Sequence, residues 1–503
     1  MRISSVTSKS VRAICIALLV LLTGCAQSAG KPFPKAVNDI STLDWHKCEK
    51  YFQCATMTLP VDYEDPSMGT FDMAVIRFRD ANQHDRLGSL VVNPGGPGVS
   101  GIEYALNAQY IIDPDVLDRY DIVGFDPRGI GQSSPIHCLN DAQQDVSFSG
   151  DAKPDSPEEL KTLVDDAQTF AANCVAKTNY LASFTTANAA KDMEQLRIAL
   201  GDPQLNYMGF SYGTYLGTLY AQMFPTTVGR FVLDGAIDPT LDTYQQNVIQ
   251  SQAFDKALAN FTTDCLRRTT CPLPKNTNPQ FFADFLAARA DSPLKSKESP
   301  DRPVTQSLIV TGMASALYNN DSGWPMLRTA FEEANDGEGT TFLNLADAYS
   351  GRNLNGTYMD NQNDANIVID CLDWNQNRSV ADIQTHVVDF VAVAPVFGPY
   401  IAYSGVVCNA LNEVLNISLS TDQNTVRIQK TATPVVVIGT TQDPATPYAW
   451  AQALARYIPG SRLITMKGEG HTGYGRGSVC TDSAVDTYLV SGELPAKNLV
   501  CTH

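Results

Sequence analysis

One five-residue segment, Gly-Phe-Ser-Tyr-Gly at positions 209–213, constrains the fold of this chain more than any other feature. It is the only Gly-x-Ser-x-Gly in the sequence; a short strand-like run (206–208) precedes it and a helical stretch (214–224) follows it. The turn between such a strand and helix is tight, so small residues must flank the serine, and the turn exposes the hydroxyl at the helix N-terminus. The segment therefore predicts a strand–turn–helix unit with Ser211 at the edge of a sheet.

Further strand-like runs alternate with helical stretches on both sides of this segment. Apolar, β-rich runs separated by helices are typical of a mainly parallel sheet with helices on both faces. Between about residues 240 and 425 the signals are helical and loop-like instead. We therefore expect one domain split by a helical insertion, with a first part at 46–240, the insertion at 241–425 and a second part at 426–503. The predicted strands lie at 55–61, 73–79, 90–93, 121–125, 206–208, 230–233, 434–439 and 462–466, and a helix is predicted at 187–200.

A serine hydroxyl is a poor nucleophile at neutral pH, so Ser211 needs a base, and the base needs an orienting carboxylate. Of the three histidines that follow it, His471 lies in a glycine-rich loop directly after a predicted strand, at the sheet edge where catalytic groups converge. His386 lies in a helical stretch, and His503 is the last residue. Asp443 follows the strand before that of His471, so we predict Asp443 as the acid and His471 as the base.

Other carboxylates compete for the acid role. Asp234 also ends a predicted strand and is the main alternative, whereas Asp373 and Glu469 are weaker candidates. Asp443 also fits a helix N-cap or an Asx turn before Pro444, and it could serve both purposes.

Backbone N–H groups must stabilise the negative charge that develops on a carbonyl oxygen under attack. The N–H of Tyr212, directly after the serine, is one predicted donor. The loop at 93–98 (Asn-Pro-Gly-Gly-Pro-Gly) follows a predicted strand and supplies the other, with Gly96 preferred and Gly95 as the alternative. Glycines permit a close backbone approach, and the prolines stiffen the loop.

Two segments, at 96–101 and 468–473, match the G-x-G-x-x-G pattern of dinucleotide-binding loops. Two matches in one chain show that this pattern alone is weak evidence for dinucleotide binding. Pro97 also removes a backbone donor where a pyrophosphate would bind. The histidines form no zinc-type pair with a cysteine couple, so we expect no cofactor and no metal. A formal net charge of -18 also argues against a nucleic-acid partner.

The N-terminal segment is typical of export. Three basic residues (Arg2, Lys9 and Arg12) precede a short apolar run at 13–22, which ends in Leu-Thr-Gly before Cys25. This arrangement resembles a bacterial lipobox, so we predict a signal peptide at 1–24, a lipid on Cys25 that attaches the protein to a membrane, and a tether at 25–45. Ordinary secretion with cleavage near Ala26 or Ala29 is the alternative.

Cysteine usage agrees with an extracytoplasmic location in the cell envelope. Without Cys15 and Cys25, ten cysteines remain, enough for five disulfides. The sequence alone does not fix their pairing; we prefer sequential pairing, because three successive pairs each lie within one local segment. The ten are Cys48, Cys54, Cys138, Cys174, Cys265, Cys271, Cys371, Cys408, Cys480 and Cys501.

Several motifs together resemble the tripeptidyl-aminopeptidase branch of the proline-iminopeptidase-like α/β-hydrolases. They lie at 93–98, 124–129 (Gly-Phe-Asp-Pro-Arg-Gly), 209–213, 233–235 and 470–471. The resemblance is strong in both sheet halves and weak in the insertion. It implies an α/β-hydrolase fold with a helical cap inserted after the sixth strand, and cleavage of short peptides from free N-termini. On the matching positions it also implies a triad of Ser211, Asp443 and His471, with Gly96 and Tyr212 as oxyanion donors.

The substrate is less constrained than the chemistry. An exopeptidase needs carboxylates to hold the substrate ammonium group, and Asp370 and Asp373 in the insertion are candidates, although a solvated loop held by a disulfide explains them equally well. A carboxylesterase or lipase would use the same triad. A non-catalytic binding lipoprotein on a hydrolase scaffold is a third hypothesis, which the complete set of catalytic groups disfavours.

Overall fold

A ten-stranded sheet runs through the part of the chain that the structure, a computed structural model, describes: residues 43–80, 83–374, 378–417 and 427–502. Its strands are β1 (His46–Lys47), β2 (Phe52–Pro60), β3 (Thr70–Phe78), β4 (Gly88–Asn93), β5 (Tyr120–Phe125), β6 (Leu205–Phe210), β7 (Val228–Asp234), β8 (Val436–Gln442), β9 (Arg462–Glu469) and β10 (Leu499–Thr502). They lie in the order β1-β2-β3-β5-β4-β6-β7-β8-β9-β10. From β5 to β10 every neighbouring pair is parallel, and β1, β2 and β3 form an antiparallel edge. The predicted, mainly parallel α/β sheet is confirmed.

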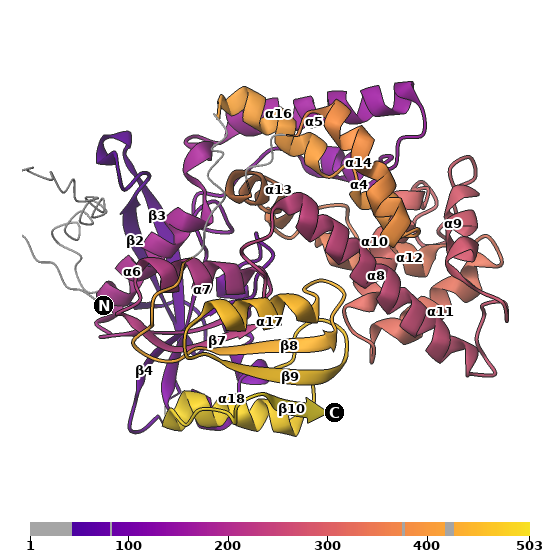
Figure 1. Cartoon of the computed structure of the whole chain (residues 1–503). Coiled ribbons are helices and arrows are strands. Elements are labelled where there is room, and N and C mark those ends of the chain that lie inside the picture. Colours follow the sequence, from indigo (N-terminus) through magenta and orange to yellow (C-terminus); the bar gives the residue numbers. More distant parts are fainter. Residues whose placement is uncertain (1–42, 81–82, 375–377, 418–426, 503) are drawn as a thin grey trace, which may run out of the picture. The chain divides into compact units, whose positions relative to one another are not determined.

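The central strands are apolar on both faces, which is why they occur as continuous hydrophobic runs in the sequence. In β4, Val91 packs into the core on one face of the sheet, while Leu90 and Val92 pack into the core on the other. Two late helices show the same division: α17 (Tyr448–Tyr457) and α18 (Val479–Ser491) lie on opposite sides of β8 and β9 (Figure 1).

The remaining helices of the sheet-forming parts come before β8. Three short ones follow β4, namely α1 (Gly101–Leu106), α2 (Ala108–Ile111) and α3 (Pro114–Leu117). The next are α4 (Asp141–Ser149), α5 (Pro157–Lys177), α6 (Thr186–Leu200) and α7 (Tyr212–Met223). The sequence placed α6 and α7 within two residues of these bounds, but α18 and β10 were not predicted.

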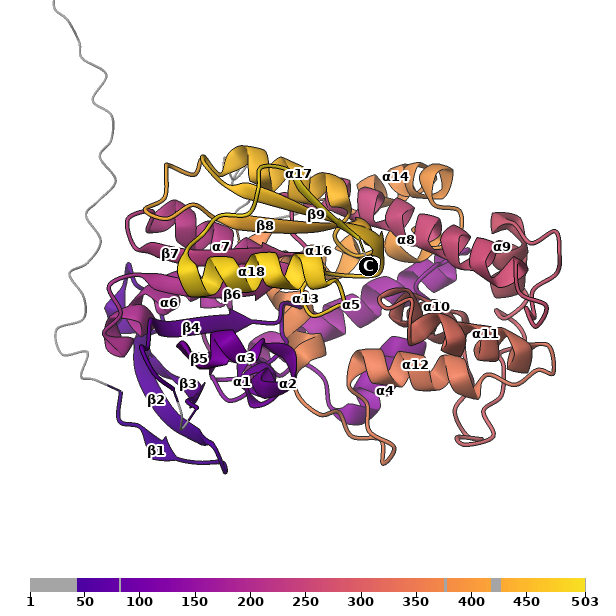
Figure 2. The same cartoon turned by 90° about the horizontal axis from the view of Figure 1, so that it is seen from below.

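Neighbouring strands β7 and β8 are separated in the sequence by a long helical segment. When the two-residue β1 is not counted, β7 is the sixth strand, the position that the family resemblance implies for a cap. Figure 2 shows the helices from α8 to α12 on one side of the strands. The helices are α8 (Thr243–Leu266), α9 (Pro279–Ala287), α10 (Gln306–Leu317), α11 (Gly323–Ala334), α12 (Thr340–Ser350), α13 (Gln362–Asp373), α14 (Val380–Val393), α15 (Gly398–Ile401) and α16 (Gly405–Leu415).

The helical segment has an aromatic core of its own. Phe331 packs edge-to-face on Phe342, with ring centroids 5.2 Å apart, and also contacts Phe261 and Phe282. α5, which precedes β6 in the sequence, packs beside α16, as Figure 1 shows. A helix that precedes β6 in the sequence therefore packs on a helix of the insertion, which follows β6.

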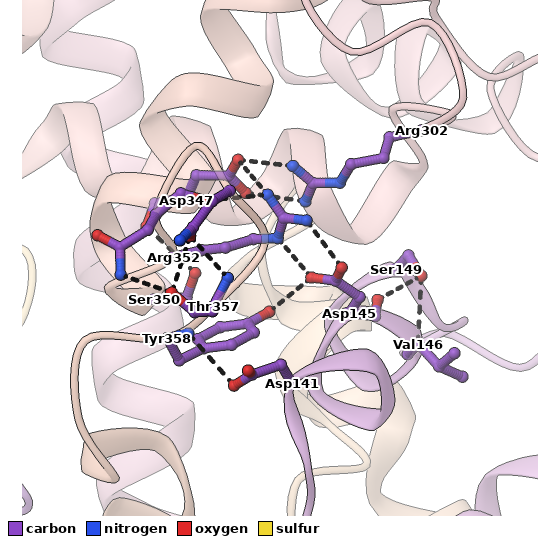
Figure 3. A network of polar contacts seen from close by, with 12 residues as sticks. Asp141, Asp145, Val146, Ser149, Arg302, Asp347, Ser350, Arg352, Thr357 and Tyr358 are labelled. Atoms are coloured by element: carbon purple, nitrogen blue, oxygen red, sulfur yellow. Dashed lines mark hydrogen bonds and ion pairs between the residues drawn. The ribbon is translucent and has the colours of Figure 1, made fainter.

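An ion-pair network joins α4 to the insertion (Figure 3). Arg352 donates two hydrogen bonds to Asp145 of α4, and Tyr358 donates a third through its hydroxyl, at 3.0 Å. Asp347 at the end of α12 accepts two more from Arg302. Two-pronged arginine–carboxylate pairs fix geometry as well as charge, so this network holds the 351–358 loop against α4.

All ten predicted disulfide cysteines are paired sequentially, as expected. The pairs are Cys48–Cys54, Cys138–Cys174, Cys265–Cys271, Cys371–Cys408 and Cys480–Cys501. Cys371–Cys408 links α13 to α16.

The predicted signal segment, Cys25 and the tether up to residue 42 lie outside the described residues. Within the residues that are described, no helix is both long and apolar enough to cross a membrane.

Candidate active site

Ser211 occupies the sharp turn between β6 and α7. Its backbone has φ 54° and ψ −123°, a conformation that L-residues rarely adopt. A Cβ at Gly209 would lie 2.5 Å from the carbonyl oxygen of Gly213, and one at Gly213 would lie 2.7 Å from Oδ1 of Asn93. Both flanking positions therefore require glycine, which is the physical reason for the pattern in the sequence.

Asp443 and His471 come together at the ends of β8 and β9. The imidazole Nδ1 lies 2.9 Å from Oδ2 of Asp443 and 3.0 Å from Oδ1. Because an ionised carboxylate only accepts hydrogen bonds, Nδ1 carries the proton and Nε2 is the acceptor of the neutral ring.

The Asp443 carboxylate is buried and held by other donors. The N–H groups of Ala445 and Thr446 donate to Oδ1 at 2.9 and 2.8 Å, and the Thr446 hydroxyl and the Thr472 N–H donate to Oδ2. Asp443 therefore orients the imidazole and also makes the Asx-type turn before the next helix, as the sequence suggested it could. Thr446 was not foreseen, since a threonine three residues after an aspartate is too common to be a signal.

The serine turn and the imidazole meet across the end of β7. The Ser211 N–H donates to the carbonyl oxygen of Asp234 at 2.8 Å. A Cβ at the next residue, Gly235, would lie 3.2 Å from Cε1 of His471. The carboxyl ends of β6, β7, β8 and β9 thus bring Ser211, Asp443 and His471 to one edge of the sheet, as is usual for parallel sheets.

The glycine loop after β4 lies against this turn. A Cβ at Gly95 would lie 3.0 Å from Cβ of Ser211 and 3.2 Å from the backbone nitrogen of Tyr212. A Cβ at Gly96 would instead meet the backbone of Gly98 and Val99 within its own loop. Both glycines have positive φ angles, and the loop adjoins the first predicted oxyanion donor.

Comparison with known proteins agrees with this geometry. Family models match residues 88–306 (alpha/beta hydrolase fold) and 394–501 (TAP-like protein). Serine protease Hip1 of Mycobacterium tuberculosis is 34% identical over 510 residues, covering 96% of each chain. Carboxylesterase B of the same species is 35% identical and covers 91% of this chain and 89% of its own. Tripeptidyl aminopeptidase of Streptomyces coelicolor is 29% identical and covers 91% and 86%.

This chain belongs to the TAP-like α/β-hydrolases. It is a serine hydrolase, and the family resemblance stated from its motifs is confirmed.

Asp234, the alternative acid, does not hydrogen-bond to the imidazole in the part of the chain that the structure describes. Its carboxylate accepts hydrogen bonds of 2.8 to 3.0 Å from the N–H groups of Gly473 and Tyr474, which follow the histidine by two and three residues. Full burial raises the pKa of Asp234 to about 6 despite these donors. In this hydrolase Asp234 fixes the loop that carries His471.

The other sequence candidates lie elsewhere. Glu469 accepts from the amide of Asn260 on α8. His386 lies on α14, where its ring packs edge-to-face on Tyr244. Within the described ranges, no group of histidine, cysteine, aspartate and glutamate side chains is arranged to hold a metal ion.

Two carboxylates of α13, the buried Asp373 and the half-buried Asp370, act electrostatically on the tyrosines that follow Ser211. Burial, together with the neighbouring charge of Asp373, raises the pKa of Asp370 to about 8, and burial raises the pKa of Asp373 to about 7. Their charges in turn raise the pKa values of Tyr212 and Tyr215, after the larger effect of burial. Asp373 accepts from the N–H and hydroxyl of Thr186. The carboxylate of Asp370, by contrast, accepts no hydrogen bond from any residue that the structure describes.

α13 itself packs on the glycine loop. The side-chain amide of Asn366 donates to the carbonyl oxygen of Pro97 at 3.1 Å, and a Cβ at Gly98 would lie 2.5 Å from the carbonyl oxygen of Gln362. Asp370 lies one helical turn after Asn366 and so projects from the same side of α13. These contacts place the helical turn before Asp370 against the predicted oxyanion loop of the hydrolase.

Proposed function

We propose that this hydrolase is an exported serine exopeptidase that releases di- or tripeptides from free N-termini through an acyl-enzyme on Ser211. The observation that carries the proposal is the Asp443–His471 pair beside a serine held in a strained turn. The relatives named as a serine protease and a tripeptidyl aminopeptidase support peptides as substrates.

The proposed catalytic cycle assigns one step to each of these groups. The Ser211 hydroxyl attacks the peptide carbonyl while Nε2 of His471 takes its proton, and Asp443 stabilises the resulting imidazolium. The N–H groups of Tyr212 and Gly96 stabilise the oxyanion. The C–N bond then breaks, the amine leaves with the proton from His471, and water hydrolyses the acyl-enzyme by the same route.

Asp370 supplies a reason for exopeptidase action. The Asp370 carboxylate is half-buried and its pKa is raised to about 8, and among the described residues no cation pairs with it and no group donates a hydrogen bond to it. A peptide ammonium group satisfies both needs. Substrates with free N-termini then gain an ion pair that acetylated ones cannot make.

A carboxylesterase is the second candidate, since the same triad hydrolyses esters and the carboxylesterase B relative covers nearly the whole chain. For export, the five disulfides and the basic-then-apolar N-terminus provide the support, and attachment through a lipid on Cys25 follows from the lipobox-like segment.

The first experiment measures hydrolysis of mono-, di- and tripeptidyl p-nitroanilides, each with free and acetylated N-termini, beside a short-chain ester. We expect free-amine di- or tripeptides to be preferred. Turnover of the ester alone would replace the peptidase with the esterase. Ser211→Ala should lower turnover by about 10⁶ while the circular dichroism spectrum stays unchanged; surviving activity would exclude Ser211 as nucleophile.

A second experiment tests the ammonium site. Asp370→Asn should lower kcat/KM for free-amine peptides by about ten- to a hundredfold and leave acetylated substrates and the ester unchanged, because one charge-assisted hydrogen bond is lost. Asp389→Asn on α14 removes an exposed carboxylate of the insertion and serves as the matched control. Equal losses for free and acetylated substrates would contradict the assignment.

A further inference from the structure

The backbone of the histidine loop is held almost entirely by the sheet-forming part of the chain. The Thr472 N–H donates to Asp443, and the Thr472 carbonyl oxygen accepts from the Thr440 hydroxyl at 2.7 Å. The next two N–H groups donate to Asp234. All of these partners lie at the ends of β7 and β8.

His471 itself is different, because its backbone contact comes from the insertion. Its N–H donates at 2.9 Å to the carbonyl oxygen of Tyr318, the residue that ends α10. The Tyr318 ring also packs edge-to-face on the imidazole, with centroids 5.2 Å apart and an interplanar angle of 81°. One insertion residue thus contacts both the backbone and the ring of the proposed base.

Arg476 links the end of α10 to the histidine loop. Its Nη1 donates to the carbonyl oxygens of both His471, at 2.9 Å, and Tyr318, at 3.3 Å. A Cβ at Gly470 would lie 2.8 Å from the Tyr318 carbonyl oxygen and from Nη2 of Arg476, so only glycine fits there. Burial lowers the pKa of Arg476 although the charges of Asp321, Asp234 and Asp443 oppose that shift.

The end of α10 and the histidine loop supply each other's hydrogen-bond partners. The last carbonyl groups of a helix have no partner within the helix, and an unpaired buried N–H group is costly. Separating α10 from the histidine loop would leave the Tyr318 carbonyl and the His471 N–H without these partners. The ring contact adds a steric limit on rotation of the imidazole about its side-chain bonds.

We propose that Tyr318 is a positioning residue for His471: the end of α10 holds the base of the triad in line with Asp443 and Ser211. The inference rests on the proposed function, since it assigns a role relative to that triad. It makes the insertion part of the catalytic apparatus and not only of the substrate-binding side. Arg476 is the second positioning residue, because it ties the same carbonyl to the histidine backbone.

The test compares Tyr318→Phe, which keeps the ring, with Tyr318→Ala, which removes it, on the full chain. Misplacing a reacting group by a fraction of an ångström costs roughly ten- to a hundredfold in rate. We expect Tyr318→Ala to lower kcat by about tenfold or more for both peptide and ester, with KM changed by less than about twofold, and Tyr318→Phe to stay within about twofold of the parent.

A spectroscopic readout separates positioning from a general loss of structure. The imidazole proton shared with Asp443 gives a far-downfield NMR resonance, which should broaden or disappear in Tyr318→Ala and persist in Tyr318→Phe. Phe285→Ala removes a partly buried ring of the insertion that contacts Phe331 and Phe342 and serves as the matched control. It should leave both kcat and the resonance in place.

Arg476→Met provides an independent test that leaves the Tyr318 ring intact, and it should lower kcat in the same selective way. Unchanged kcat in Tyr318→Ala, an equal loss in Phe285→Ala, or an equal loss in Tyr318→Phe would overturn the inference. If Ser211→Ala retained activity, the proposed function would fall instead, so the two failures are distinguishable. If Tyr318→Ala does not fold, Arg476→Met with the NMR measurement decides the question.

Discussion

The sheet side and the insertion side of the site hold their side chains in different ways. On the sheet side, the Asp443 carboxylate accepts hydrogen bonds from the imidazole, two turn residues and the histidine loop. On the insertion side, the Asp370 carboxylate is only half-buried, and no described residue donates a hydrogen bond to it. The proposed catalytic groups are therefore complete before substrate arrives, whereas the proposed recognition group is left for the substrate to complete.

The difference has a structural origin. Ser211, Asp443 and His471 follow β6, β8 and β9, which lie with β7 in one run of parallel strands whose register fixes where each loop begins. The insertion is held instead by separate contacts, such as the Asp145–Arg352 network of Figure 3, the hydrogen bond between Asn366 and Pro97, and the hydrogen bond from the His471 N–H to the Tyr318 carbonyl. The position of the insertion relative to the site therefore depends on a few particular contacts.

The largest expected effect separates two buried aspartates of the sheet side. Asp443→Asn should lower kcat by about 10⁴, because an amide no longer stabilises the imidazolium or its tautomer. Asp234→Asn should cost much less, about ten- to a hundredfold, because Asp234 only fixes the backbone of the loop. Steady-state kinetics on the preferred peptide measure both; a larger loss in Asp234→Asn would reverse the assignment of the acid.

An intermediate effect concerns the disulfide that holds α13. Replacing Cys371 and Cys408 by serine should lower the free energy of unfolding by about 4 kcal/mol, from the entropy of the 37-residue loop that the bond closes. It should also raise KM for free-amine peptides, because α13 carries Asp370. The matched control replaces Cys265 and Cys271, which close only a six-residue loop.

Urea denaturation and kinetics read out both disulfide variants. The control should lose about 2 kcal/mol and keep its KM. Equal KM values in the two variants would show that the position of α13 does not govern substrate binding.

The smallest effect is a pH dependence confined to the insertion side. Below its pKa of about 8, Asp370 is neutral and cannot pair with an ammonium group. The kcat/KM ratio of free to acetylated peptides should therefore fall as pH decreases from 8 to 6, by up to about tenfold per unit, and fall again above about 8, where the peptide amine loses its proton. Asp370→Asn should abolish the acidic fall; a ratio that does not change with pH would contradict the ion pair.

The parallel sheet and the candidate catalytic residues at its edge could be predicted from the sequence alone. Continuous apolar runs and the glycines around Ser211 report local requirements, namely burial on both faces and a turn without room for a Cβ, so they are visible without tertiary structure. His471 and Asp443 could be predicted because each directly follows a strand. The choice between Asp443 and Asp234 also came from position along the chain, but only their contacts explain what Asp234 does.

How the insertion meets this edge could not be predicted from the sequence. Tyr318, Arg476 and Thr446 stand in no motif, because their roles depend on backbone carbonyls and neighbours far away in the sequence. Asp370 and Asp373 were visible as carboxylates, but their burial and the lack of a described donor to Asp370 arise only when α13 packs on the loop after β4. Short-range patterns encode turns and strands, whereas contacts between segments more than a hundred residues apart depend on packing that no local pattern records.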